Sequence, residues 1–260
     1  MVNDCEHDHI CWGSGQKHCG DHTLTVRHLH AHYGTVIALD DIDFSISCGH
    51  TMAIMGPNGA GKSTLIKAIA GLLRPSSGSV LWNDAPLSDT PGEIAYLPQR
   101  SEVDWCFPHT VRSFVETGRY PALGIWRKFS QHDREIVEKS LESMGLSDLA
   151  QRQIGALSGG QQQRVFLARA LAQEAHVLLF DEPFTGLDSP SCEMLGNLLS
   201  SPAHEGRLII ASHHDLHTAE ALFDTTLLLR KKMIAIGNSH ELSANGTVRS
   251  AYTEADKTQP

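Results

Sequence analysis

One segment of nine residues has the composition of a phosphate-binding loop. Residues 56–64 read Gly-Pro-Asn-Gly-Ala-Gly-Lys-Ser-Thr and fill every position of the pattern G-x-x-x-x-G-K-[ST]. Glycines let consecutive backbone N–H groups turn inward around phosphate oxygens, the lysine reaches the β- and γ-phosphates, and the serine hydroxyl can ligate Mg²⁺. The sequence therefore predicts that a nucleoside triphosphate is bound by Gly56, Pro57, Asn58, Gly59, Ala60, Gly61, Lys62, Ser63 and Thr64.

A second candidate lies where an apolar segment ends in two carboxylates. Residues 177–180 read Val-Leu-Leu-Phe, and Asp181 and Glu182 follow directly. One acid at such a position can hold Mg²⁺ while the other orients or deprotonates the attacking water. We therefore expect Asp181 to bind the metal and Glu182 to act as the base. The alternative is an acidic loop after a core strand.

A third candidate is the turn Leu157-Ser158-Gly159-Gly160-Gln161, which precedes an expected helix. Small residues at a helix N-terminus form an anion site. Since one nucleotide does not need two phosphate cradles, we expect this turn to contact the γ-phosphate held by a second copy of the chain, with the two copies paired head to tail. The alternative is that the Ser-Gly-Gly turn only caps the helix.

Strands that alternate with helices must position these residues. We expect a β-rich opening over residues 23–46, and strands over 51–55, 78–82, 94–97, 177–180, 208–210, 225–229 and 233–236. Helices are expected over 63–73 and 161–172, with a mostly helical insert from Thr110 to a stop at Gly145. This alternation predicts a largely parallel sheet that is covered on both faces.

Composition narrows the class of protein. The chain has 260 residues, 41% of them apolar, and a formal net charge of −9. This charge argues against non-specific nucleic-acid binding, which requires an excess of Lys and Arg. We find no apolar stretch long enough to cross a bilayer and no basic-then-apolar leader, and so expect a cytosolic protein.

The motifs together resemble the ATP-binding subunit of an ATP-binding cassette (ABC) transporter. The series runs in order through residues 56–64, Gln99, residues 157–161, Asp181-Glu182, Asp188 and His214. The resemblance implies an α/β fold with a P-loop NTPase (RecA-like) core, an antiparallel β subdomain and a helical insert at about residues 101–170. It also implies ATP and Mg²⁺ as ligands and an ATPase domain over residues 23–240.

Roles follow position by position from this resemblance. Tyr33 would stack on adenine, although a core or edge-strand tyrosine is the alternative. Gln99 would touch Mg²⁺ and the attacking water, so that Ser63, Gln99 and Asp181 form the predicted metal set. Asp188 would cross the dimer interface. His214 would contact the γ-phosphate and is preferred over His213 because the family's histidine precedes an aspartate, which here is Asp215.

Residues 104–111, 118–120 and 161–164 are similar to the zinc and manganese branch of importers, with iron as a further candidate cargo. This implies a homodimer on the cytoplasmic face of the membrane, bound to integral membrane permease subunits and served indirectly by an extracytoplasmic solute-binding protein, with no nucleic-acid partner. The rival interpretations are a soluble ABC ATPase that acts on ribosomes or DNA, and an exporter subunit.

The two ends of the chain lie outside this resemblance. Residues 1–22 carry Cys5, His7, His9, Cys11, His18, Cys19 and His22 and have few apolar side chains, so we expect a flexible arm. Thiolate and imidazole suit Zn²⁺ or a similar ion, but the cysteine spacing is not that of a close knuckle, and a composition-biased tail without a fixed site is the alternative. Residues 241–260 are expected to form a tail.

Overall fold

The computed structural model describes residues 22–90, 92–103, 105, 108–124, 128–187, 189–200 and 206–244. The strands are β1 (Thr23–Tyr33), β2 (Val36–Ser47), β3 (Thr51–Met55), β4 (Ser77–Trp82), β5 (Ala85–Pro86), β6 (Ile94–Leu97), β7 (Val177–Phe180), β8 (Leu208–His213), β9 (Thr225–Arg230) and β10 (Lys232–Asn238). The α-helices are α1 (Lys62–Ile69), α2 (Val111–Glu116), α3 (Tyr120–Leu123), α4 (Gln131–Ser143), α5 (Gly159–Ala172), α6 (Ser189–Ser200), α7 (Leu216–Leu222) and α8 (Ser239–Ala244). The 3₁₀ helices are η1 (Leu87–Asp89), η2 (Arg100–Glu102), η3 (Thr117–Arg119), η4 (Ser147–Leu149) and η5 (Ile154–Ala156).

The main sheet has the order β10-β9-β3-β8-β7-β6, and only the β10–β9 pair is antiparallel. Met55 pairs with His213, and Leu97 with Phe180, so neighbouring parallel strands end at the same level. Because loops that follow parallel strands meet at one edge, the segments after β3, β6, β7 and β8 gather there. The expectation of a largely parallel sheet is confirmed, and strands 51–55, 94–97 and 177–180 have the predicted bounds.

Alternate side chains of the central strands enter two different cores. In β7, Leu178 and Phe180 join a core with the helical segment, whereas Val177 and Leu179 join a second core with α1 and the smaller sheet. Successive side chains on a strand point to opposite faces, and a strand that is covered on both faces is apolar throughout. The uninterrupted run of apolar residues in β7 is therefore explained by burial on both sides.

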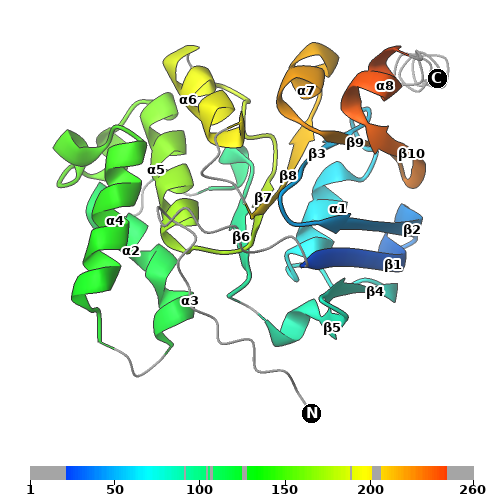
Figure 1. The fold of residues 1–260 in the computed structure, drawn as a ribbon, viewed down its shortest axis with the longest axis horizontal. Coiled ribbons are helices and arrows are strands. Elements are labelled where there is room, and N and C mark those ends of the chain that lie inside the picture. The colour runs from blue at the N-terminus through cyan, green and yellow to red at the C-terminus, as the bar shows by residue number, and fades with distance from the viewer. Residues whose placement is uncertain are drawn as a thin grey trace.

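The second sheet is antiparallel, with the order β2-β1-β4-β5. A bulge interrupts β1 at His28, whose φ is 44°. Leu24 and Val26 before the bulge and Leu29 and Ala31 after it are all buried, so the extra residue shifts the inward alternation by one position. In Figure 1 this sheet lies beside α1, on the side of the molecule away from α2 to α5.

The helical segment packs through α5, which contacts both α2 and α4.

Two predicted helix bounds differ from the structure. Helix α1 ends at Ile69 because Gly71 adopts a left-handed φ of 72° and the N–H of Leu72 turns back to the Lys67 carbonyl. Leu72, expected on the buried face, is 64% exposed. Helix α5 begins two residues before the predicted start, because Ser158 caps it.

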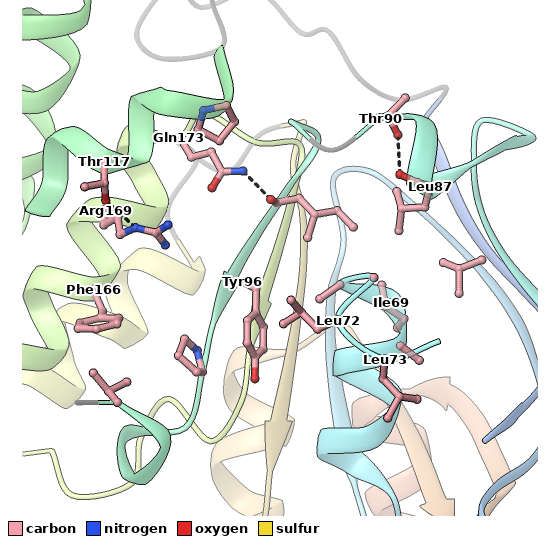
Figure 2. Close-up of a pocket in the computed structure, with 18 of the residues that line it drawn as sticks. Ile69, Leu72, Leu73, Leu87, Thr90, Tyr96, Thr117, Phe166, Arg169 and Gln173 are labelled. Atoms are coloured by element: carbon pink, nitrogen blue, oxygen red, sulfur yellow. Dashed lines mark hydrogen bonds between the residues drawn. The ribbon is translucent and has the colours of Figure 1, made fainter. Parts of the chain in front are cut away.

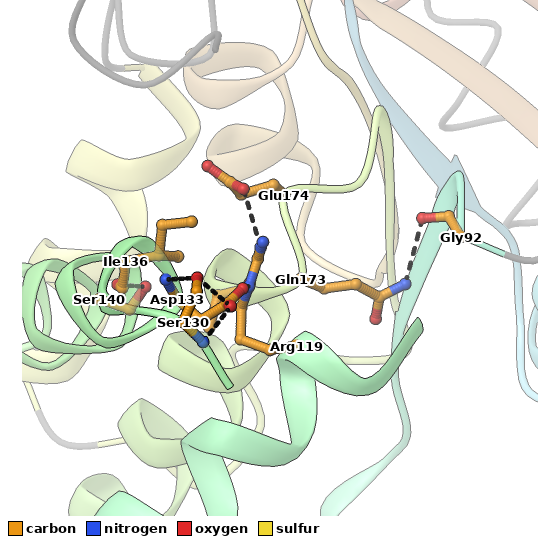
Figure 3. Close-up of polar contacts among 9 residues, drawn as sticks. Gly92, Arg119, Ser130, Asp133, Ile136, Ser140, Gln173 and Glu174 are labelled. Atoms are coloured by element: carbon orange, nitrogen blue, oxygen red, sulfur yellow. Dashed lines mark hydrogen bonds and ion pairs between the residues drawn. The ribbon is translucent and has the colours of Figure 1, made fainter. Parts of the chain in front are cut away.

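A network of buried charged residues connects the parts of this helical segment near the end of α5 (Figure 3). Arg119 is only 5% exposed, and its Nε donates to Asp133 Oδ1 at 3.0 Å. Its Nη1 donates to the Ala172 carbonyl and to Glu174 Oε2, each at 2.8 Å. Asp133 in turn accepts from the backbone N–H of Ser130, the N-cap of α4. One guanidinium therefore joins η3, the start of α4 and the end of α5.

Within the described residues, no helix combines the length and apolar character needed to cross a bilayer. Several sequence predictions concern positions outside the description: the Cys/His-rich arm up to residue 21, Asp104, Cys106 and Phe107 of the importer-like segment, Asp188, and residues 245–260 of the tail.

Candidate active site

The loop after β3 is wedged between β9 and β2, and this contact explains two of its glycines. A Cβ on Gly56 would lie 2.1 Å from the carbonyl oxygen of Leu229. A Cβ on Gly61, where φ is 100°, would lie 2.6 Å from the carbonyl oxygen of Ala38. Neither backbone oxygen can move aside alone, so only glycine fits at these positions. The loop is thus held close against the sheet with its shape fixed from both sides.

Lys62 is the first residue of α1 and is folded back over this loop. Its Nζ donates to the carbonyls of Gly56 at 2.7 Å and Pro57 at 3.1 Å. Burial lowers the pKa of Lys62, and the nearby carboxylates of Glu182 and Asp181 act in the opposite direction. The ammonium group therefore sits inside the loop, where phosphate oxygens could replace its two carbonyl partners.

Asp181 and Glu182, which follow β7, are fixed by one hydroxyl from the neighbouring strand β8. Ser212 Oγ donates to Asp181 Oδ1 at 2.7 Å and accepts from the backbone N–H of Glu182, also at 2.7 Å. Asp181 is 1% exposed, and its Oδ2 is buried without a hydrogen-bond partner among the described residues. An unpartnered buried carboxylate oxygen is costly, so it points to a ligand that this oxygen would bind.

Gln99 and Glu182 meet although 83 positions separate them in the chain. Gln99 Nε2 donates to Glu182 Oε2 at 2.7 Å, and Thr185 Oγ1 donates to the same oxygen at 3.3 Å. Gln99 follows β6 and Glu182 follows β7, which are adjacent parallel strands. The amide of Gln99 keeps a carbonyl oxygen in addition to this donor, so it could hold Glu182 and a metal or water at once.

The two histidines after β8 lie in different surroundings. His213 is 4% exposed, and its ring contacts the rings of Phe184 at 5.1 Å and Phe223 at 6.2 Å between centroids. Burial, with a smaller contribution from His214, lowers the pKa of His213 to about 4, so its ring stays neutral at physiological pH. His214 is exposed. Exposure therefore favours His214 as the histidine that meets a ligand.

Tyr33 ends β1, and its side chain is 53% exposed. Val36 and Ile37, the first two residues of β2, are 59% and 43% exposed beside it. The interpretation of Tyr33 as a core tyrosine is wrong. An exposed aromatic ring among apolar side chains is suited to stacking on a flat apolar ligand.

The Ser158 turn forms a complete capping box at the start of α5. The Ser158 hydroxyl accepts from the Gln161 N–H at 3.3 Å, and Gln161 Oε1 accepts from the Ser158 N–H at 3.0 Å. Helix capping by this turn is therefore present within one chain. A contact with a second copy remains a prediction, because it needs that copy.

Two residues that sequence reasoning missed contribute to this region. Ser212 is the hydroxyl that joins the two acids, and its signal was a single polar residue before the histidines in an otherwise apolar strand. Arg100 lies so close to Gly159 that a Cβ there would be 2.6 Å from its guanidinium, and its Nη2 donates to Gln162 Oε1 at 3.2 Å. Its signal was its position directly after Gln99. Arg100 thus connects the Gln99 loop to the Ser158 turn and adds positive charge beside it.

The geometry brings Lys62, Gln99, Asp181 and Glu182 to one edge of the main sheet, which is what phosphoryl transfer from a nucleotide requires. Asp188, the predicted interface residue, is outside the described positions.

Comparison with known proteins gives the family of this chain. A family model described as "ABC transporter" matches residues 39–185. The manganese transport system ATP-binding protein MntB of Listeria innocua is 41% identical over 89% of this chain and 97% of its own length. A probable metal transport system ATP-binding protein of Chlamydia trachomatis is 44% identical over 88% of both chains. The solved structure of cbiO1 from Clostridium perfringens, part of the ABC transporter complex cbiONQ, superposes with a TM-score of 0.72 at 30% identity, covering 86% of this chain and 92% of that one. This chain therefore belongs to the ABC transporter ATP-binding proteins and is an ATPase of that family.

Proposed function

We propose that this chain is the ATP-hydrolysing subunit of an importer for a divalent metal ion, zinc or manganese, with iron as a further candidate, and that it acts as a homodimer bound to a membrane permease on its cytoplasmic face. The observation that carries the ATPase role is the meeting of Gln99 with Glu182 beside Asp181 and Lys62. The metal cargo is supported by the names of the Listeria and Chlamydia relatives.

ATP would be bound by Tyr33 on its adenine and by residues 56–64 on its phosphates. We infer that Mg²⁺ is held by Ser63, Gln99 and Asp181, because hydroxyl, amide and carboxylate oxygens are the ligands it prefers and Asp181 Oδ2 is buried without a partner among the described residues. When bound, Mg²⁺ would neutralise charge on the β- and γ-phosphates.

Hydrolysis would depend on the proton chemistry of Glu182. Its carboxylate would orient or deprotonate the attacking water, while Gln99 keeps it in place through the 2.7 Å hydrogen bond. Lys62 would neutralise part of the phosphate charge. His214, which follows β8, would contact the γ-phosphate. These are mainly effects of position and charge, as expected for phosphoryl transfer.

Dimerisation would complete the site from the second copy. The N-terminus of α5, with Ser158, Gly159, Gly160 and Gln161, presents backbone N–H groups and a positive helix-dipole end that suit the partner's γ-phosphate. Asp188 would cross the same interface. Arg100, packed against Gly159, would add a cation to this cradle.

The permease would dock in a groove of about 1340 Å³ between α1 and the helical segment. Figure 2 shows Ile69, Leu72 and Leu73 on one side, Phe166 and Arg169 on the other, and Tyr96 of β6 between them. The hydroxyl of Tyr96 is buried without a partner among the described residues, and Leu72 is 64% exposed. We infer that an amphipathic cytoplasmic segment of the permease binds here. Pro98 and Gln99 directly follow β6. Docking in this groove would therefore affect the position of Gln99 in the hydrolytic site.

Replacing Tyr33 with Ala is expected to weaken ATP binding by about 1–3 kcal/mol, roughly fivefold to 150-fold, because the base loses its stacking partner. Tyr33→Phe keeps the ring and should retain the affinity. The control is Tyr120→Ala, which removes a tyrosine that is 60% exposed on α3. Equilibrium binding of a fluorescent ATP analogue measures all three variants. Equal affinity in the Tyr33→Ala and Tyr120→Ala chains would remove the adenine assignment.

The transport role is tested by purifying the chain together with its permease and reconstituting both in vesicles. We expect ATPase activity to rise when the matching binding protein is loaded with Zn²⁺, Mn²⁺ or Fe²⁺, and to depend on which ion is supplied. Stimulation by ribosomes or DNA in the absence of the permease, or ion efflux in place of uptake, would contradict the proposal.

A further inference from the structure

His213 is a buried imidazole that takes no part in the proposed hydrolysis. It ends β8, its side chain is 4% exposed, and it stands between Ser212 and His214 in the chain. In the main sheet it pairs with Met55, the last residue of β3 before the phosphate loop. The backbone of His213 is therefore fixed directly beside the strand that leads into that loop.

The ring of His213 is held by contacts with other rings. Its centroid is 5.1 Å from that of Phe184, with the planes at 66° in an edge-to-face arrangement, and 6.2 Å from that of Phe223. Both separations are those of favourable aromatic pairs. Its Nε2 is buried and has no hydrogen-bond partner among the described residues. The ring is therefore positioned by packing and not by a hydrogen bond at that nitrogen.

Phe184 belongs to the loop of residues 182–187, which follows β7 and begins with the proposed base. The backbone N–H of Glu182 donates to Ser212 Oγ at 2.7 Å. Ser212 and His213 are consecutive residues of β8, so the end of this strand holds the loop at two places. One is the hydrogen bond to Glu182, and the other is the ring contact with Phe184.

The same loop also contacts the helical segment. The carbonyl of Pro183 accepts a hydrogen bond from Nε2 of Gln163, a 4% exposed residue of α5, at 3.4 Å. A Cβ on Gly186 would lie 3.7 Å from the guanidinium of Arg100, which packs against Gly159 at the start of α5. The loop therefore connects the end of β8 with the helix whose N-terminus is the proposed γ-phosphate cradle.

These contacts join two parts of the proposed ATP site that serve different nucleotides. His214 would contact the ATP bound by its own chain, whereas the N-terminus of α5 would contact the ATP bound by the partner. The contact between His213 and Phe184 lies on the path between them. Because protein interiors are close-packed, a change at this contact shifts the groups packed against it. The relative position of the two parts therefore depends on the His213 ring.

We propose that His213 is a positioning residue whose ring contact with Phe184 sets the loop of residues 182–187, and with it the Ser158 turn, for ATP-dependent pairing of two copies. The inference rests on the proposed function, because it requires the dimer that shares each ATP. Hydrolysis depends on the same contact, since the loop begins with the proposed base. ATP binding by a single copy does not depend on it, because residues 56–64 make the phosphate contacts.

The test measures ATP-dependent dimerisation by sedimentation velocity in the Glu182→Gln background, and hydrolysis in chains that keep Glu182. His213→Ala should weaken dimerisation and lower kcat by about tenfold each, while ATP affinity changes less than about twofold. His213→Phe keeps the ring and should restore both to within about threefold of the unaltered chain. Phe184→Ala should resemble His213→Ala. The double variant should be no weaker than either single variant, because both remove the same contact.

The matched control is Phe44→Leu, which removes a 6% exposed ring from the core of the second sheet and should leave dimerisation unchanged. Normal dimerisation of His213→Ala or Phe184→Ala would overturn the inference. So would a defective His213→Phe chain, additive losses in the double variant, or a loss of ATP affinity as large as the loss of dimerisation. Failure of the Glu182→Gln chain itself to dimerise with ATP would contradict the proposed function and this inference together.

Discussion

The Glu182→Gln variant is expected to bind ATP like the unaltered chain and to hydrolyse it about a thousandfold more slowly, because an amide cannot accept the proton of the attacking water. The substitution changes little else. Residue 182 follows β7, and its backbone N–H donates to the hydroxyl of Ser212. Its side chain accepts hydrogen bonds from Gln99 and Thr185. Glutamine has the same size, so the site should retain its shape. Phosphate release and ATP binding, measured on the same preparation, test both halves of this expectation.

The matched control for this variant is Glu138→Gln, which makes the same chemical change on α4 at a carboxylate paired with Arg112. Its turnover should stay within about twofold of the unaltered chain, since surface ion pairs contribute little. A Glu182→Gln chain that hydrolyses ATP within about tenfold of the normal rate would show that another group activates the water.

Replacing Arg119 with Leu should lower the free energy of unfolding by about 3–5 kcal/mol. The guanidinium is 5% exposed and binds the carboxylates of Asp133 and Glu174 as well as the carbonyl of Ala172 (Figure 3). Without it, the 5% exposed carboxylate of Asp133 remains in the interior with no opposite charge. The expected decrease in melting temperature is about 10 °C, measured by circular dichroism.

The control is Arg112→Leu, which removes an exposed pair with Glu138 and should cost at most about 1 kcal/mol. The double variant Arg119→Leu with Asp133→Asn should recover part of the loss, because it removes the unpaired charge and keeps an acceptor for the Ser130 N–H. Equal losses for Arg119→Leu and Arg112→Leu would mean that the network does not stabilise the helical segment.

The same network has a pH dependence with a defined sign. Burial would raise the pKa of Asp133, but hydrogen bonds from Ser130 and the guanidinium of Arg119 outweigh it and hold this pKa below its usual value. A carboxyl with a lowered pKa in the folded state contributes stability above its unfolded pKa of about 4 and loses it as the pH falls. The difference in stability between the Asp133→Asn variant and the unaltered chain should therefore shrink below about pH 4.

Local patterns predicted the parts of this site that depend on neighbouring residues. The glycines of residues 56–64, the run of apolar residues before Asp181 and the small residues of the Ser158 turn each follow from one short segment, and the structure has strands and helices where those segments require them. The order of the main sheet then brings Gln99 and Glu182 together, because β6 and β7 are adjacent.

What sequence reasoning missed depends on contacts between distant segments. Ser212 reaches the two acids because β8 is adjacent to β7. Its place as a polar residue in an apolar strand marks the position, but not the residues that it contacts. Arg100 reaches Gly159 across 59 positions through a long side chain. The end of α1 was misplaced because Leu72 and Leu73 continue the apolar period, although Gly71 has already ended the helix. Hydrophobic periodicity alone cannot distinguish apolar residues on the buried face of a helix from apolar residues that line a groove.

We propose that two copies of the chain bind each ATP between the phosphate loop of one and the Ser158 turn of the other. Sedimentation velocity with ATP tests it in the Glu182→Gln background, with Ser158→Glu added to place a negative charge at that turn. Ser130→Glu, which removes the equivalent capping box of α4, controls for loss of a helix cap. We predict that the Glu182→Gln chain and its Ser130→Glu derivative form dimers with ATP, whereas the Ser158→Glu derivative binds ATP with unchanged affinity and stays a monomer. Equal dimerisation of the Ser158→Glu derivative would contradict the account.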